Sequence, residues 1–379
     1  MPSVSRRRFL QSLAVGTAAS AALEWPLRSL DISGSPEPAR SLPSSGVILL
    51  NSNENPYGPL PLAMAAMRDA LREAHRYPDS QYDILVNRVA ALHKVEPHQV
   101  LTGCGSTEIL RIAADAFLAT GGKLIMAAPT FEAIDMYARP TGAEIIRVPL
   151  TKDHAHDLDA MLARMGSSAG LVYICTPNNP TGSLTARKDI EAFLSKLNPR
   201  AYVLMDEAYH HFATGAHEYK SFLDLPVDDA RVIVARTFSK VYGMAGVRLG
   251  YGISHPATIQ KMRPLQQQDN VNMLAARAGV VALDDAAGIE AAVERNARDR
   301  EEFMRQAEAR GVKPIPSYGN FVMMNAGRPA QDVIEHFKRN HVLVGRRFPP
   351  METFVRVSLG TPDEMKEFWR IWDLLPRKA

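Results

Sequence analysis

Cysteine is scarce in this chain of 379 residues, which has only Cys104 and Cys175. Two thiols can build neither a disulfide framework nor a four-thiolate metal site, so we expect both to be free. Long apolar runs are also missing, because no segment reaches the roughly 20 uncharged residues that span a bilayer. We therefore expect no stable membrane insertion of the mature chain.

Most of the sequence has no excess of positive or of negative charge. Lysine and arginine number 44 against 41 aspartates and glutamates, and Arg6, Arg7 and Arg8 account for the net charge of +3. Residues 1–22 contain no acid, so residues 23–379 are net neutral. A neutral body gives no electrostatic reason to expect nucleic acid or an anionic membrane as a partner.

The N-terminus has the three parts of a secretory signal. The arginines precede Phe9 and Leu10, an apolar stretch follows over Leu13–Leu23, and small residues at 19–22 suit a signal peptidase. Adjacent arginines followed by Phe-Leu resemble the twin-arginine export signal. We predict a signal peptide over residues 1–22, a linker over 23–45 and export to the periplasm. A plain basic helix is the alternative and would leave the chain in the cytoplasm.

From residue 46 onward, short apolar runs alternate with amphipathic stretches. This alternation predicts an α/β fold whose large domain has a mainly parallel sheet sandwiched by helices. The expected strands are Lys123–Ala128, Glu144–Val148, Leu171–Cys175, Tyr202–Met205, Val232–Ala235, Asn320–Asn325 and Val355–Leu359. The expected helices are Leu62–Ala74, Ser106–Leu118, Ala186–Leu197 and Ile289–Ala309.

The long polar-faced helix Ile289–Ala309 is expected to separate two domains. We predict a large domain over residues 76–285 and a smaller α+β C-terminal domain over 286–379. Residues 46–75 are expected to form an N-terminal segment that packs with the small domain.

Polar side chains follow three successive predicted strands. Asn179 follows the first, and Asp206 with Tyr209 follows the second. Lys240 and Arg248 follow the third. Because ligands bind at the carboxyl ends of strands in open α/β sheets, we expect these side chains to meet there. Taken singly, each has an ordinary alternative, namely a surface lysine, a capping or metal-binding carboxylate, or a plain turn. No set of residues with metal-ligand spacing surrounds Asp206, and we expect no metal site.

Together these side chains suit pyridoxal 5′-phosphate. A lysine amine can form an imine with its aldehyde, and a carboxylate can keep its pyridine nitrogen protonated. Neutral donors can hold its phenolic oxygen, and the planar fork of an arginine can clamp its phosphate.

A glycine-rich turn offers the backbone amides that a phosphate also needs. Gly103-Cys104-Gly105 leads into the predicted helix Ser106–Leu118, whose N-terminal amides and dipole attract an anion. Plain capping of this helix by Ser106 or Thr107 is the alternative.

Five segments resemble a known enzyme family. Asn179-Pro180-Thr181-Gly182, Asp206-Glu207-Ala208-Tyr209 and Ser239-Lys240 with Arg248 are similar to motifs of the fold-type I pyridoxal-phosphate aminotransferases. Asn53 through Pro59 and Arg76-Tyr77-Pro78-Asp79 resemble the histidinol-phosphate aminotransferase branch. The resemblance runs from about Leu49 to Glu364 and implies a homodimer with shared active sites.

The resemblance implies a role for each matching residue. Lys240 forms the imine and then moves a proton between the substrate Cα and the cofactor. Asp206 pairs with the pyridine nitrogen, while Tyr209 and Asn179 bond the phenolic oxygen. The remaining cofactor residues are Phe131, which stacks on the ring, Gly105, Ser106, Thr107, Thr237, Ser239 and Arg248 at the phosphate, and Tyr77, which reaches the phosphate of the partner subunit.

Three further residues are implied at the substrate. Arg356 matches the residue that binds the substrate carboxylate, and an arginine between apolar neighbours needs an anion to offset its desolvation. A structural salt bridge is the alternative. Tyr57 and Arg346 fall where the family surrounds the far end of the substrate. The segment Gly345–Met351 departs from the branch's pattern, which leaves histidinol phosphate itself open as the substrate.

We therefore predict an aminotransferase that moves an amino group between an amino acid, or an amino-alcohol phosphate, and a 2-oxo acid. Another pyridoxal-phosphate activity, such as a decarboxylase, lyase or oxidase, could use the same residues. An exported binding protein without enzymatic activity is the remaining alternative.

Overall fold

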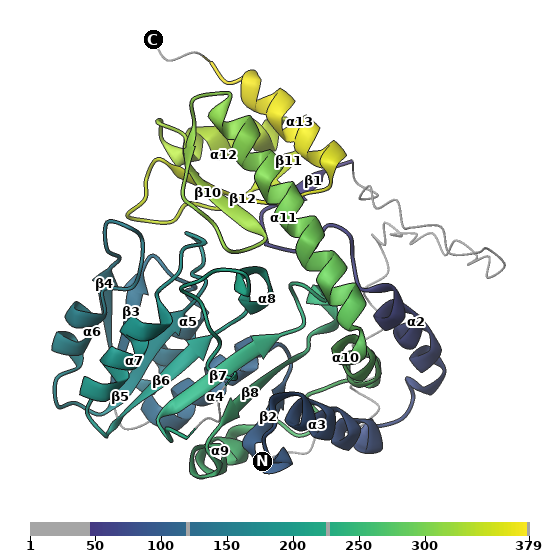
Figure 1. Cartoon of the computed structure of the whole chain (residues 1–379), viewed down its shortest axis with the longest axis vertical. Coiled ribbons are helices and arrows are strands. Elements are labelled where there is room, and N and C mark those ends of the chain that lie inside the picture. The colour runs from purple at the N-terminus through teal and green to yellow at the C-terminus, as the bar shows by residue number, and fades with distance from the viewer. Residues whose placement is uncertain (1–45, 119–121, 225–227, 377–379) are drawn as a thin grey trace, which may run out of the picture. The chain divides into compact units, whose positions relative to one another are not determined.

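The computed structural model describes residues 46–118, 122–224 and 228–376 (Figure 1). These residues belong to one compact unit. The predicted signal and linker, residues 1–45, lie outside the described residues. Within the described ranges, no helix is both long and apolar enough to cross a membrane.

A seven-stranded sheet forms the centre of this unit. Its strands are β2 (Val100–Gly103), β8 (Gly250–Ser254), β7 (Val232–Thr237), β6 (Ala201–Asp206), β5 (Gly170–Cys175), β3 (Lys123–Ala128) and β4 (Glu144–Pro149), in that spatial order. Only β8 runs antiparallel to its neighbours, and all other adjacent pairs are parallel. The predicted mainly parallel sheet is confirmed.

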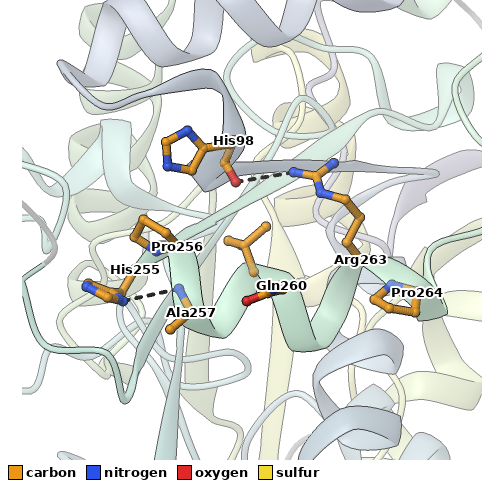
Figure 2. A pocket seen from close by; sticks show the side chains of 8 residues that line it. His98, His255, Pro256, Ala257, Gln260, Arg263 and Pro264 are labelled. Atoms are coloured by element: carbon orange, nitrogen blue, oxygen red, sulfur yellow. Dashed lines mark hydrogen bonds between the residues drawn. The ribbon is translucent and has the colours of Figure 1, made fainter.

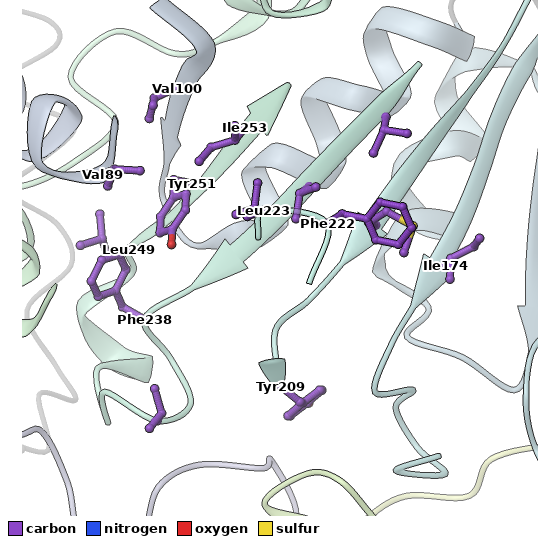
Figure 3. Close-up of a cluster of buried hydrophobic side chains, with 14 of the residues drawn as sticks. Val89, Val100, Ile174, Tyr209, Phe222, Leu223, Phe238, Leu249, Tyr251 and Ile253 are labelled. Atoms are coloured by element: carbon purple, nitrogen blue, oxygen red, sulfur yellow. The ribbon is translucent and has the colours of Figure 1, made fainter. Parts of the chain in front are cut away.

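Helices cover both faces of the sheet, and consecutive strand residues point into separate cores. In β5, Val172 and Ile174 join one hydrophobic cluster, while Leu171 and Tyr173 join another. Figure 3 shows part of the first cluster, including Ile174. Every residue of β5 is buried, as expected for a strand covered on both sides. The first cluster draws on α2 (Pro61–Ala70), α3 (Asp79–His93), α6 (Leu158–Met165), α7 (Arg187–Lys196) and α10 (Met273–Asp284), and the second on α4 (Ser106–Leu118), α5 (Ala133–Ala138) and α9 (Pro256–Met262).

Two smaller sheets involve the C-terminal elements. Strand β10 (Phe321–Asn325) pairs antiparallel with β12 (Phe354–Ser358) and β9 (Lys313–Pro314). Strand β1 (Ile48–Leu50) pairs parallel with β11 (Val342–Val344). A third hydrophobic cluster joins β1, β10, β11 and β12 to α11 (Ala286–Glu308), α12 (Ala330–Arg339) and α13 (Pro362–Asp373).

The N-terminal segment 46–75 contacts two parts of the chain. Its strand β1 pairs with β11, whereas its helix α2 packs against α10. The predicted boundary at residue 286 coincides with the first residue of α11. The division into a large and a small domain stays a prediction.

A buried ion pair lies directly beside the carboxyl end of β6. Arg236 of β7 contacts Glu207 with Nη2 2.8 Å from Oε2, and both side chains are at most 5% exposed. The hydroxyl of Ser221 and the amide of Phe222 also donate to the Glu207 carboxylate, at 2.7 and 2.8 Å. Nε of Arg236 donates to the same carboxylate at 2.9 Å. Because four donor contacts satisfy this carboxylate, the pair can hold the loop after β6 in place.

Replacing Glu207 tests this role. The substitution Glu207→Ala leaves the Arg236 charge buried without a counter-ion, and we expect it to lower the free energy of unfolding by about 3–5 kcal/mol. The matched control is Asp363→Ala, which removes an exposed pair with Lys366 and should cost less than about 1 kcal/mol. Urea unfolding followed by circular dichroism measures both. Equal losses in the two variants would contradict the role.

Candidate active site

The carboxyl ends of three neighbouring parallel strands bring the predicted residues to one edge of the sheet. Cys175 at the end of β5 is in register with Asp206 at the end of β6, and Asp206 is in register with Ala235 of β7. The loops that follow these positions carry Asn179, Tyr209 and Lys240.

Lys240 lies at this edge without an acidic partner. Its Nζ donates to the backbone oxygens of Asn53 at 3.0 Å and Ser52 at 3.4 Å. Among the described residues, no carboxylate oxygen lies within 4 Å of this nitrogen. Desolvation, together with the charge of Arg356, lowers the pKa of Lys240 to about 8. More of the amine is therefore neutral near pH 7 than at the ordinary pKa of a lysine, and the neutral form is the one that a nucleophile requires.

Asp206 is buried and close enough to Lys240 for their charges to interact. The Tyr173 hydroxyl donates to Oδ2 at 2.7 Å, and the Ala208 amide donates to Oδ1 at 3.1 Å. Burial raises the pKa of Asp206, against the opposing effects of these hydrogen bonds and of the Lys240 charge. A cation placed against this carboxylate would stabilise its ionised form.

Tyr209 and Asn179 are both already hydrogen-bonded. The Tyr209 hydroxyl accepts from Nδ2 of Asn53 at 2.9 Å and keeps its own proton to donate. Burial raises the pKa of this phenol, so it stays protonated. Oδ1 of Asn179 accepts from Nη1 of Arg356 at 2.6 Å, which leaves the amide N–H groups as donors. Each residue can thus offer a neutral hydrogen-bond donor.

Arg248 lies against the N-terminus of α4. Its Nη2 is 3.3 Å from Oγ1 of Thr107, and its Nη1 is 3.5 Å from Oγ of Ser239. Gly105 has φ +77°, and a Cβ built there would lie 2.1 Å from Nη2 of Arg248. Glycine at position 105 therefore lets the guanidinium approach the backbone.

The other residues predicted for the phosphate complete this group. Ser106 is the first residue of α4, a helix of 13 residues. Oγ1 of Thr237 donates to Oγ of Ser239 at 3.0 Å. Amides, hydroxyls and one guanidinium thus converge at a helix N-terminus, which is the donor set of an anion site.

Arg356 of β12 is buried without a counter-ion. Its Nη1 and Nη2 donate to Asn179 and to the Asn51 backbone oxygen, while Nε is buried and has no hydrogen-bond partner. No carboxylate of the described ranges lies within 4 Å of its guanidinium, so the alternative of a structural salt bridge is not observed. Burial and the charge of nearby Arg346 lower the pKa of Arg356 to about 10. The guanidinium is therefore available to an anion from outside the chain.

The remaining predicted residues occupy different surroundings. Arg346 forms an ion pair with Glu132. Phe131, the residue before Glu132, is half-buried. The Tyr57 hydroxyl donates to Asp299 of α11 at 3.0 Å rather than to the Lys240 cluster. Tyr77 is 75% exposed and, among the described residues of one chain, does not contact the Lys240 cluster.

Two residues that hold the site together are not among those predicted from the sequence. Asn53 bonds Tyr209 through its side chain and Lys240 through its backbone oxygen, and it has φ +53°. Tyr173, which is fully buried in β5, donates to Asp206. The only signal for Asn53 is its place at the start of the Asn53–Pro59 motif, and the signal for Tyr173 is a hydroxyl within an apolar strand.

A separate pocket of about 740 Å³ lies beside α9 (Figure 2). Arg263 donates to the backbone oxygen of His98 at 3.3 Å there, and the Ala257 amide donates to His255 at 3.2 Å. The pocket contains none of the predicted site residues. The Lys240 cluster is therefore the better candidate for chemistry.

Comparison with known proteins agrees with this geometry. Residues 45–371 match the family model described as aminotransferase class I and II. A histidinol-phosphate aminotransferase of Moorella thermoacetica is 35% identical over 336 residues, which are 88% of this chain and 86% of the relative.

Two solved structures are also similar. A putative histidinol-phosphate aminotransferase from Erwinia carotovora atroseptica is 31% identical with a TM-score of 0.83, over 87% of this chain and 96% of the other. A histidinol-phosphate aminotransferase from Sinorhizobium meliloti, in complex with pyridoxal-5′-phosphate, is 26% identical with a TM-score of 0.80, over 86% and 91%. The match over most of its length shows that this chain belongs to the class I and II aminotransferase family.

Proposed function

We propose that this chain is a pyridoxal-phosphate-dependent aminotransferase that moves an amino group between an amino acid, or an amino-alcohol phosphate, and a 2-oxo acid. One observation carries the proposal, namely the Lys240 amine without an acidic partner, held near both Asp206 and Arg248. The relatives named histidinol-phosphate aminotransferase support the reaction type. The pyridoxal-5′-phosphate complex of the Sinorhizobium relative supports the cofactor.

The residues present fit this cofactor. Gly105 lets the Arg248 guanidinium lie against the backbone at the N-terminus of α4, where a Cβ would collide with it. Asp206 is a buried carboxylate that a pyridinium nitrogen would stabilise. Arg248, Ser239 and Thr107 supply charged and hydroxyl donors for a phosphate.

When bound, pyridoxal phosphate supplies an aldehyde that reacts with amines and a cationic ring that withdraws electrons from the substrate carbon. Lys240 supplies the amine, and its lowered pKa lets Nζ take and return a proton near neutral pH. Asp206 would stabilise the positive charge of that ring, while Tyr209 and Asn179 would donate hydrogen bonds to the phenolic oxygen of the cofactor.

Arg356 orients the substrate. Its guanidinium lies next to Asn179 and above the rings of Phe321 and Phe348, at 5.7 and 4.9 Å from their centroids. A carboxylate bound to it would restore the counter-ion that the buried charge lacks. A charge-assisted contact of this kind contributes about 1.5–3 kcal/mol, which is enough to orient an amino acid.

Replacing Lys240 tests the function. We expect Lys240→Ala to abolish transamination and the visible absorbance of cofactor joined to the protein, because the substitution removes the amine that would form the imine. Lys261→Ala is the control, since Lys261 bonds the hydroxyl of Tyr202 outside the cluster and should leave both signals intact.

The same assay separates the alternatives. Oxo-acid product identifies transamination, whereas amine, ammonia or peroxide would identify a decarboxylase, lyase or oxidase. Retention of activity and absorbance in Lys240→Ala would refute the role of Lys240, and a wild-type protein without cofactor affinity would favour a pure binding protein.

We infer that the functional unit is a homodimer in which Tyr77 reaches the partner's cofactor phosphate. The exposure of Tyr77 supports this inference, because a side chain that is 75% exposed is accessible to a partner subunit. We expect sedimentation to give a dimer, and Tyr77→Phe to weaken cofactor affinity by roughly 10- to 100-fold through loss of a phosphate hydrogen bond. Tyr202→Phe, which also removes one hydroxyl, is the control. A monomer, or equal affinity in both variants, would contradict the inference.

We propose further that the chain is exported by a twin-arginine signal. The support is the sequence of residues 1–22, with adjacent arginines before an apolar stretch. We expect the full chain in the periplasmic fraction and the double variant Arg6→Lys, Arg7→Lys in the cytoplasm. Export of the double variant, or a cytoplasmic wild type, would disprove the signal.

A further inference from the structure

Two arginines share one aromatic ring near the proposed substrate position. The Cζ atoms of Arg356 and Arg346 lie 4.9 and 4.4 Å from the centroid of the Phe348 ring. Their charges are close enough to interact, since Arg346 contributes to the lowered pKa of Arg356, after the larger effect of burial. Two like charges this close favour the binding of anions between or beside them.

Glu132 neutralises only one of these arginines. Its carboxylate pairs with Nη2 of Arg346, and the two side chains are 49% and 53% exposed. Across the part of the chain that the structure describes, no other carboxylate lies within 4 Å of either guanidinium. The cluster therefore holds two positive charges and one negative charge, which leaves one positive charge for a ligand.

The position of Glu132 ties this charge to the substrate site. It directly follows Phe131, and Thr130 bonds the side chain of Asn178 at 2.7 Å, next to Asn179. Arg356 bonds Asn179 from the other side. The loop that carries Glu132 is thus bonded to the loop that carries Asn179, the residue that Arg356 contacts. Arg346, the partner of Glu132, lies at the proposed far end of the substrate.

We propose that Glu132 is a specificity-determining residue that occupies Arg346 and so favours substrates with an uncharged far end over those with a distal carboxylate or phosphate. The proposal rests on the proposed function, because it takes Arg356 as the site of the substrate carboxylate. A second anion must displace Glu132 from Arg346 and then lie beside its negative charge. A substrate with one carboxylate avoids both costs.

The expected effect is moderate. Both partners of the Glu132–Arg346 pair are about half exposed, and ion pairs of this kind contribute little because water screens them. We expect removal of the Glu132 charge to improve binding of a dianion by about five- to tenfold relative to a monoanion.

Binding of two ligands of equal chain length measures this effect. Glutarate carries a carboxylate at both ends, and pentanoate carries one. We expect Glu132→Gln to strengthen glutarate binding to the cofactor-loaded full chain about five- to tenfold in titration calorimetry, with pentanoate changed less than twofold. Glu352→Gln is the matched control, because Glu352 pairs with neighbouring Arg347 at similar exposure and should leave the affinity ratio unchanged.

A second variant assigns the effect to Arg346. In the background Arg346→Met, we expect Glu132→Gln to leave the ratio of the two affinities unchanged. An unchanged ratio in Glu132→Gln alone, an equal change in Glu352→Gln, or a gain that persists without Arg346 would overturn the proposal. These binding ratios do not depend on amino transfer, whereas absence of oxo-acid product from every donor would refute the proposed function.

Discussion

The amine of Lys240 is held by the backbone oxygens of Ser52 and Asn53, which lie 188 and 187 positions earlier in the chain. A carbonyl oxygen fixes the position of the amine but, unlike a carboxylate, does not tie up its positive charge. Burial can therefore lower the pKa of Lys240 to about 8. The Asn53 side chain also bonds Tyr209, so one short segment positions both the amine and the phenol.

The charged side chains around Lys240 also contact neutral groups. Asp206 is buried against neutral donors, while Arg248 and Arg356 contact hydroxyls, amides and carbonyls rather than carboxylates of the described chain. Such groups cost stability in an empty protein and gain partners when a ligand brings the opposite charges. The adjacent pair of Glu207 and Arg236 contrasts with them, because its charges satisfy each other and hold the loops that carry the site.

Much of the central sheet could be predicted from the sequence. The bounds of β3 and α4 are as expected, because β3 is a short continuous apolar run and α4 has a helical period. Strand β8 was missed because glycines at 250 and 252 interrupt its apolar pattern. Helix α10 was missed because it is apolar on most of its surface and lies buried between α2 and α3.

The residues that could do the chemistry can be identified from the amino-acid sequence alone. An alternation of strands and helices places polar side chains after β5, β6 and β7, and parallel strands bring such ends to one edge whatever their other contacts. How these side chains are paired depends on the packing of the folded chain. The contacts of Asn53 with Tyr209, of Arg356 with Asn179 and of Glu132 with Arg346 join residues that are more than 150 positions apart. Local propensity carries no information about such contacts, because they depend on how whole elements pack.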